Sequence, residues 1–146
     1  MNDIADDQPE SGVSVSDINE FLARDFTGAM NTCEAIGKRW AVARMTPSES
    51  NLRPGSIISG QTVFGLCDAT LYYACFTVIG IEPMVLTSEM SIRYLRPARG
   101  DVLRARAVLD HAGKRSLIGT VTVWTDAPER PVAVAQGTYV VPVPRG

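Results

Sequence analysis

The chain of 146 residues has the length of one ordinary domain, and with 45% hydrophobic and 21% charged residues it should bury a core of its own. Its formal net charge of -2 excludes the basic excess that most nucleic-acid-binding proteins carry, so we expect no nucleic acid partner. Cys33, Cys67 and Cys75 form an odd set without C-x-x-C spacing, which indicates a reducing cytoplasm and neither a disulfide framework nor a metal site.

The first 15 residues are polar and acidic and are expected to form a flexible tail. They have no basic start and no apolar run, so the sequence predicts no secretory signal. The longest apolar stretch, residues 71–81, is too short to span a bilayer, and we expect no membrane partner. One domain should therefore occupy residues 16–146.

Residues after the tail predict an amphipathic helix that Ser16 or Asp17 caps. Its apolar positions at helical spacing are Ile18, Phe21, Leu22, Ala29 and Met30. Residues 37–47 mix polar and apolar side chains before a proline, which predicts an edge strand or the end of a helix continuing from residue 31. Residues 48–56 are dense in turn formers and predict a loop.

The segment that starts at Gly60 has apolar residues on every side of a helix as far as Ile79, and Gly80 should end that helix. Such a pattern is typical of a helix buried all round. One ionisable residue, Asp68, lies in the middle of this apolar run, and its presence requires a structural or a chemical explanation.

Four strands follow, over residues 84–94, 103–109, 116–125 and 132–141, with a hairpin turn at residues 111–115. Short connections favour an antiparallel meander, in which the first strand is half-buried. The economical packing for one apolar helix and these strands is an α+β fold whose curved sheet wraps around the helix. Because one short sheet hardly covers such a helix, we expect at least a dimer.

Two short motifs carry a resemblance to a known family. Ser59-Gly60-Gln61 precedes the helix, and Leu66-Cys67-Asp68 follows with the acidic residue nine positions after Ser59. With the strand TSEMSIRYLRPARGD, the turn GKR and the closing VAVAQGTYVV, the sequence resembles the hotdog-fold acyl-CoA thioesterases of the PaaI and 4-hydroxybenzoyl-CoA thioesterase type from about Gly37 to Pro142. Ser59 and Gln61 stand where those proteins commonly have His and a second Gly.

The resemblance implies an antiparallel curved sheet around a long central helix, with an N-terminal helix added. It also implies an acyl-CoA substrate, no cofactor, and a dimer or a dimer of dimers. Asp68 would act as the general base or as the nucleophile, and Thr87 or Ser88 would hold the attacking water.

The start of the expected helix could supply the donors that thioester hydrolysis needs. The amides of Ser59, Gly60 and Gln61 lie where unpaired N–H groups and the helix dipole favour an oxyanion. Eight residues separate Gly60 from Asp68, which is roughly 12 Å along a helix, too far for both to act on one carbonyl. The site should therefore lie at a dimer interface.

Further candidates are expected to bind the substrate. Gln61, Gly65 and Tyr72 share the helix face of Asp68, where small Gly65 leaves room beside the carboxylate. Cationic residues that are candidates for the coenzyme A phosphates are Arg93, Arg96, Arg99, Lys114 and Arg115.

Two other interpretations of Asp68 stay open. It could be a buried carboxylate that fixes a dimer by hydrogen bonds, or part of a module that binds acyl-CoA without turning it over. A hydratase is disfavoured because no D-x-x-x-x-H stretch occurs.

Overall fold

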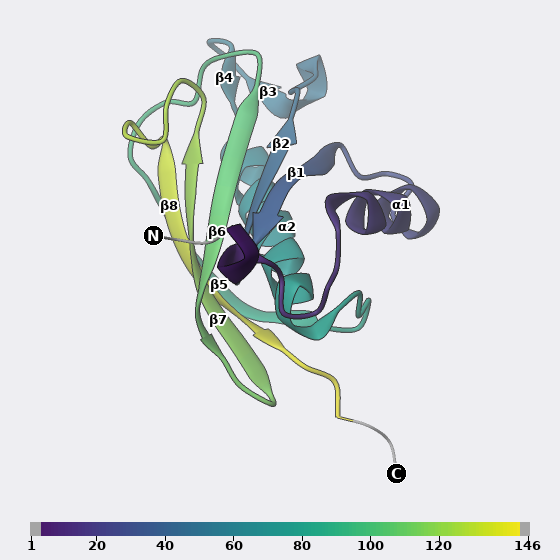
Figure 1. The fold of residues 1–146 in the computed structure, drawn as a ribbon. Coiled ribbons are helices and arrows are strands. Elements are labelled where there is room, and N and C mark those ends of the chain that lie inside the picture. Colours follow the sequence, from purple (N-terminus) through teal and green to yellow (C-terminus); the bar gives the residue numbers. More distant parts are fainter. Residues whose placement is uncertain (1–3, 144–146) are drawn as a thin grey trace.

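The computed structural model describes residues 4–143 and consists of one long helix packed against a six-stranded antiparallel sheet (Figure 1). The sheet has the order β1-β2-β6-β7-β8-β5 and curves around helix α2 (Gly60–Ile79). Its strands are β1 (Asn31–Gly37), β2 (Trp40–Met45), β5 (Leu86–Tyr94), β6 (Leu103–Ala112), β7 (Ser116–Trp124) and β8 (Ala133–Val140). This is the predicted α+β architecture.

Helix α2 begins and ends where the sequence predicts. The Ser59 hydroxyl accepts a hydrogen bond from the Thr62 amide at the start, and Gly80 ends the helix with φ 80°, a conformation that favours glycine. α2 is the one helix in residues 4–143 that is long and apolar enough to cross a bilayer. Of its apolar window, 61% is buried inside the protein, as in a core helix.

Helix α1 (Val15–Asp25) starts earlier than expected and is shorter. Its cap is Ser14, whose hydroxyl accepts from the Asp17 amide while the Asp17 carboxylate accepts from the Ser14 amide, so a complete capping box fixes the first turn. Ile18 is fully buried, as predicted. Ala29 and Met30, which were assigned to the helix, lie beyond its end, because the chain leaves the helical conformation at Phe26.

The expected flexible tail, over its described part, packs on the domain. It contains a short 3-10 helix, η1 (Ile4–Asp7), and the Trp40 indole donates to the Asp7 carboxylate at 3.0 Å. The Ser11 hydroxyl and amide donate to the carbonyls of Phe76 and Thr77 near the end of α2, at 2.6 and 3.0 Å. These bonds attach the segment before α1 to the domain.

Residues 31–58 differ from their prediction. A hairpin of β1 and β2 replaces the single edge strand, and β2 lies inside the sheet because β6 pairs with its other edge. Within the expected loop 48–56 there are a short 3-10 helix, η2 (Glu49–Asn51), and the strand β3 (Leu52–Arg53), which pairs with β4 (Ile57–Ile58).

The meander is confirmed for β6, β7 and β8, whereas the prediction for β5 is wrong. Residues 95–102 carry the chain from β5 past β8 and β7 to β6, so β5 pairs with β8 and forms an edge. Of its apolar side chains, Met90 and Ile92 are partly buried against the core as expected, whereas Leu86 and Tyr94 are 57% and 53% exposed. The sheet therefore ends in an open, partly apolar strand.

Candidate active site

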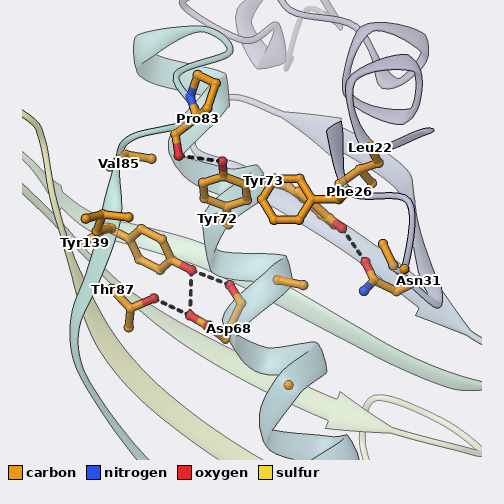
Figure 2. A pocket seen from close by; sticks show the side chains of 15 residues that line it. Leu22, Phe26, Asn31, Asp68, Tyr72, Tyr73, Pro83, Val85, Thr87 and Tyr139 are labelled. Carbon is orange, nitrogen blue, oxygen red and sulfur yellow. Dashed lines mark hydrogen bonds between the residues drawn. The ribbon is translucent and has the colours of Figure 1, made fainter. Parts of the chain in front are cut away.

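Asp68 is held by hydrogen bonds from two strands (Figure 2). The Thr87 hydroxyl of β5 donates to its Oδ1 at 2.7 Å, and the Tyr139 hydroxyl of β8 lies 2.5 Å from the same oxygen. The Tyr139 hydroxyl is also 2.8 Å from the backbone oxygen of Asp68. The ionisable residue in the apolar helix thus belongs to a three-residue polar cluster.

The local sequence explains how these side chains meet. In β8 every second residue points to the helix, and Tyr139 is the last of this inward row. In β5 the register shifts between Thr87 and Glu89, which leaves Ser88 unpaired at a bulge. Burial and the nearby Asp68 charge raise the pKa of Tyr139 above its ordinary range, so its hydroxyl stays protonated and able to donate.

A cavity of about 450 Å³ opens beside this cluster. Gly65 and Tyr72 line it together with Asp68 and Thr87, so the structure brings these four candidates together. Its other lining residues are Leu22, Phe26, Gly28, Ala29, Asn31, Ala69, Tyr73, Pro83, Val85, Leu86 and Tyr139. The cavity is mostly apolar with a carboxylate on one wall, which suits an uncharged acyl or aryl group.

Aromatic rings and one amide form part of the cavity wall (Figure 2). The Tyr72 ring stacks on Tyr139 with centroids 5.8 Å apart and meets Phe26 edge-on at 6.0 Å. Farther from Asp68, the Tyr73 hydroxyl donates to the Asn31 side-chain oxygen. Burial raises the pKa of Tyr73 above its ordinary range, which keeps this donor protonated.

Gly60 lies in a second hollow, of about 300 Å³, at the other end of β5. The Tyr94 hydroxyl donates to the Gly60 carbonyl at 2.8 Å, and Arg53 and Arg96 line the same hollow. Within residues 4–143 no acceptor is recorded for the amides of Gly60 and Gln61. These first-turn amides are free to bind an anion.

Several predicted residues lie apart from both hollows. Ser59 has its hydroxyl engaged in the helix cap, and Gln61 and Ser88 are exposed. Arg93 borders a hollow of about 380 Å³ on the sheet face that points away from α2, together with Thr120 and Gln136. Arg99 donates to the Gly55 carbonyl at 2.8 Å.

The three thiols are buried and take no part in either hollow. Cys33, Cys67 and Cys75 are free and buried, and burial raises the pKa of each thiol to about 12, which makes them poor nucleophiles at neutral pH. Over the described residues 4–143 no group of three His, Cys, Asp or Glu side chains is placed to hold a metal ion.

Sequence reasoning missed Tyr139 and the loop after α1. The alternation of residues 133–139 indicates that Tyr139 faces inward, but it does not show which residue the Tyr139 hydroxyl binds. Phe26, Ala29 and Asn31 carry no motif, and they reach the cavity only because α1 ends at Asp25.

The comparisons with known proteins agree with this fold. A family model described as the thioesterase superfamily matches residues 55–132, more than half of the chain. The chain is 26% identical over 89 residues to a Pasteurella multocida protein named "putative esterase"; the match spans 61% of the chain and 64% of that protein's length.

Solved structures share the fold. A "putative thioesterase" from Silicibacter sp. TM1040 has a TM-score of 0.80 and 26% identity, with 89% of this chain and 92% of the other covered. The PaaI protein of E. coli, from the phenylacetic acid degradation operon, has a TM-score of 0.67 and 21% identity, with 88% and 97% covered.

Proposed function

Because this chain belongs to the thioesterase superfamily, a class of thioester hydrolases, we propose that it hydrolyses the thioester of an acyl- or aryl-CoA at sites shared by two copies of the chain. The observation that carries the proposal is the placement of Asp68. Its carboxylate lies on the wall of a largely apolar cavity and is bonded to the Thr87 hydroxyl. A satisfied structural carboxylate needs no such cavity beside it.

The proposed reaction starts with the acyl group in the Asp68 cavity. In one route Asp68 takes a proton from a water, whose oxygen attacks the thioester carbonyl. The resulting oxyanion accepts hydrogen bonds from the Gly60 and Gln61 amides of the partner. The C–S bond then breaks, the proton passes to the leaving sulfur, and the products are a carboxylic acid and coenzyme A.

In the other route Asp68 attacks the carbonyl itself and expels the thiolate. A mixed anhydride forms, and water then hydrolyses it to the acid and free Asp68. Both routes use the same residues, and Thr87 fixes the carboxylate in either.

Strand β5 supports the shared site. The Asp68 cavity borders its first residues and the Gly60 hollow borders its last, at Leu86 and Tyr94 respectively. If two β5 edges pair antiparallel about a two-fold axis near the middle residue, Met90, the first residues of one strand lie beside the last residues of the other. Such pairing would bring each Asp68 cavity to the partner's Gly60 hollow and cover the exposed apolar edge.

The charge around Gly60 supports binding of coenzyme A. Of the five cations expected to meet its phosphates, Arg96 lines this hollow, and Arg53 adds a second positive charge. Guanidinium groups bind phosphates through paired hydrogen bonds. The phosphates would therefore bind at the Gly60 hollow while the acyl group enters the partner's cavity.

The test is thiol release from a panel of acyl- and aryl-CoA esters. Wild-type protein should release coenzyme A from at least one ester, and Asp68→Asn should lower kcat at least a hundredfold. Thr77→Val serves as the matched control, because it removes a buried α2 hydroxyl that donates to the Ala74 carbonyl, and neither residue lines the cavity. An Asp68→Asn protein as active as wild type would refute the role of Asp68.

A second candidate is a module that binds acyl-CoA without hydrolysis. One observation favours it: Oδ1 of Asp68 is already satisfied by two hydroxyls of the same chain. Saturable binding with no thiol release over the whole panel would support this function instead.

A further inference from the structure

The two oxygens of the Asp68 carboxylate have different surroundings. Oδ1 accepts from the hydroxyls of Thr87 and Tyr139, at 2.7 and 2.5 Å. Within residues 4–143, Oδ2 has no hydrogen-bond partner. Every buried side-chain oxygen in that part of the chain does have one, so Oδ2 is not a buried atom. The open side of the residue is the cavity that Asp68 lines.

We propose that Tyr139 is a positioning residue, which with Thr87 fixes Oδ1 of Asp68 so that Oδ2 is the oxygen that takes the proton or attacks the thioester. This inference rests on the proposed function and adds to it a residue and an assignment of the reacting atom. Tyr139 does not touch the substrate carbonyl in this scheme. It acts through Asp68 alone.

The surroundings of Tyr139 fit this role. The side chain is 3% exposed, and its ring is stacked on Tyr72, so it has little freedom to turn away. Its single proton has two acceptors on one residue, the carboxylate Oδ1 and the backbone oxygen of Asp68. A charge-assisted bond to the carboxylate is the stronger of the two, and the second contact keeps the hydroxyl beside the helix when Asp68 is protonated.

The different roles of the two carboxylate oxygens also determine which hydrogen bonds Thr87 makes. Its hydroxyl has one proton, which it donates to Oδ1. Its oxygen can still accept a hydrogen bond from a water near Oδ2. Two donors on Oδ1 prevent rotation of the carboxylate, so the lone pairs of Oδ2 keep one direction relative to the cavity.

The experiment is a double-mutant cycle on kcat and KM. Tyr139→Phe keeps the ring and removes the hydroxyl, and it should lower kcat roughly tenfold while KM stays within about a factor of two. In the Asp68→Asn background the same substitution should cause no further loss, because Tyr139 acts only through the carboxylate. Thr77→Val, which also loses a buried hydroxyl, should keep wild-type kcat.

Each outcome is informative. A wild-type protein without thiol release would refute the proposed function. Wild-type activity that Asp68→Asn abolishes and Tyr139→Phe leaves unchanged would refute only the positioning role. A tenfold loss that also appears in the Asp68→Asn background would mean that Tyr139 supports the fold and not the carboxylate.

A second measurement applies if Tyr139→Phe does not fold. A short hydroxyl–carboxylate bond should give a downfield, slowly exchanging proton in the NMR spectrum of the wild-type protein. The same resonance should move or vanish in Asp68→Asn. Its absence from the wild-type spectrum would overturn the inference.

Discussion

The two ends of strand β5 differ in what they present to a ligand. At Leu86 and Thr87 the strand borders a mostly apolar cavity, where side chains from α2, β5 and β8 meet at one carboxylate. At Tyr94 it borders a hollow that is lined by Gly60, at the start of α2, and by two arginines. The first end can supply a base and room for an acyl group, and the second can supply donors for an oxyanion and charges for phosphates. In the proposed reaction each end supplies one part of the site.

Mixing two inactive variants should give the largest effect. Asp68→Asn removes the base, and Gly60→Glu places a large charged side chain against Tyr94 beside the first-turn amides, so each alone should lose at least about a hundredfold in kcat. When equal amounts are unfolded and refolded together, half of the dimers would be hybrids with one intact site. Thiol release should return to about a quarter of wild type. No recovery on mixing would mean that each chain builds its own site.

Thr87→Val should have the next largest effect, at the Asp68 end alone. Loss of a hydrogen bond to a charged group should lower kcat by about tenfold with little change in KM. Steady-state kinetics with the best ester of the panel measures both constants. Thr87→Ser retains a hydroxyl and should keep most of the activity, so an equal loss in both variants would argue against the bond to Asp68.

A negative charge introduced on the β5 edge should weaken the proposed pairing of two β5 strands. With a two-fold axis at Met90, residue 91 of one strand lies opposite residue 89 of the other, and Glu89 already carries a negative charge. Ser91→Glu should therefore raise the dimer dissociation constant by several-fold to about tenfold through like-charge pairs, whereas Ser91→Lys should not. Analytical ultracentrifugation measures this constant. Equal behaviour of the two variants would exclude that register.

Ser59→Ala should have the smallest effect on activity and a clear one on stability. The Ser59 hydroxyl accepts from the Thr62 amide at 3.2 Å, so its loss should lower the free energy of unfolding by about 1 kcal/mol. The kcat should change less than in Thr87→Val. Ser59→Thr keeps the cap and serves as the control in thermal denaturation. A loss of kcat without a loss of stability would restore Ser59 as a substrate contact.

The sequence predicts local features of this fold better than distant pairings. Helix α2 and strands β6 to β8 follow from apolar periodicity and from Gly80, because each pattern is complete within a few turns or one strand. The edge position of β5 depends on where residues 95–102 lead the chain, and no periodicity encodes that path.

The same limit applies to the candidate site. Asp68 is conspicuous because it interrupts an apolar helix, and the resemblance points to Thr87 or Ser88. Tyr139 lies 71 residues after Asp68, and only folding brings the two together. Phe26 and Asn31 enter the cavity because a capping box starts α1 at Val15 and the chain leaves the helix after Asp25.

The buried cysteines should make the folded protein less stable at alkaline pH. Burial raises the pKa of Cys33, Cys67 and Cys75 from 9.0 to about 12, so the folded chain keeps these protons where an unfolded chain releases them. Their contribution to stability is complete below pH 9 and should fall by up to roughly 1.4 kcal/mol per pH unit for each thiol as the pH rises toward 12. Urea titrations at pH 8 and 10 can measure this alkaline loss. In a thiol-reagent assay near neutral pH, colour then comes from released coenzyme A, and any signal from the protein itself reports unfolding.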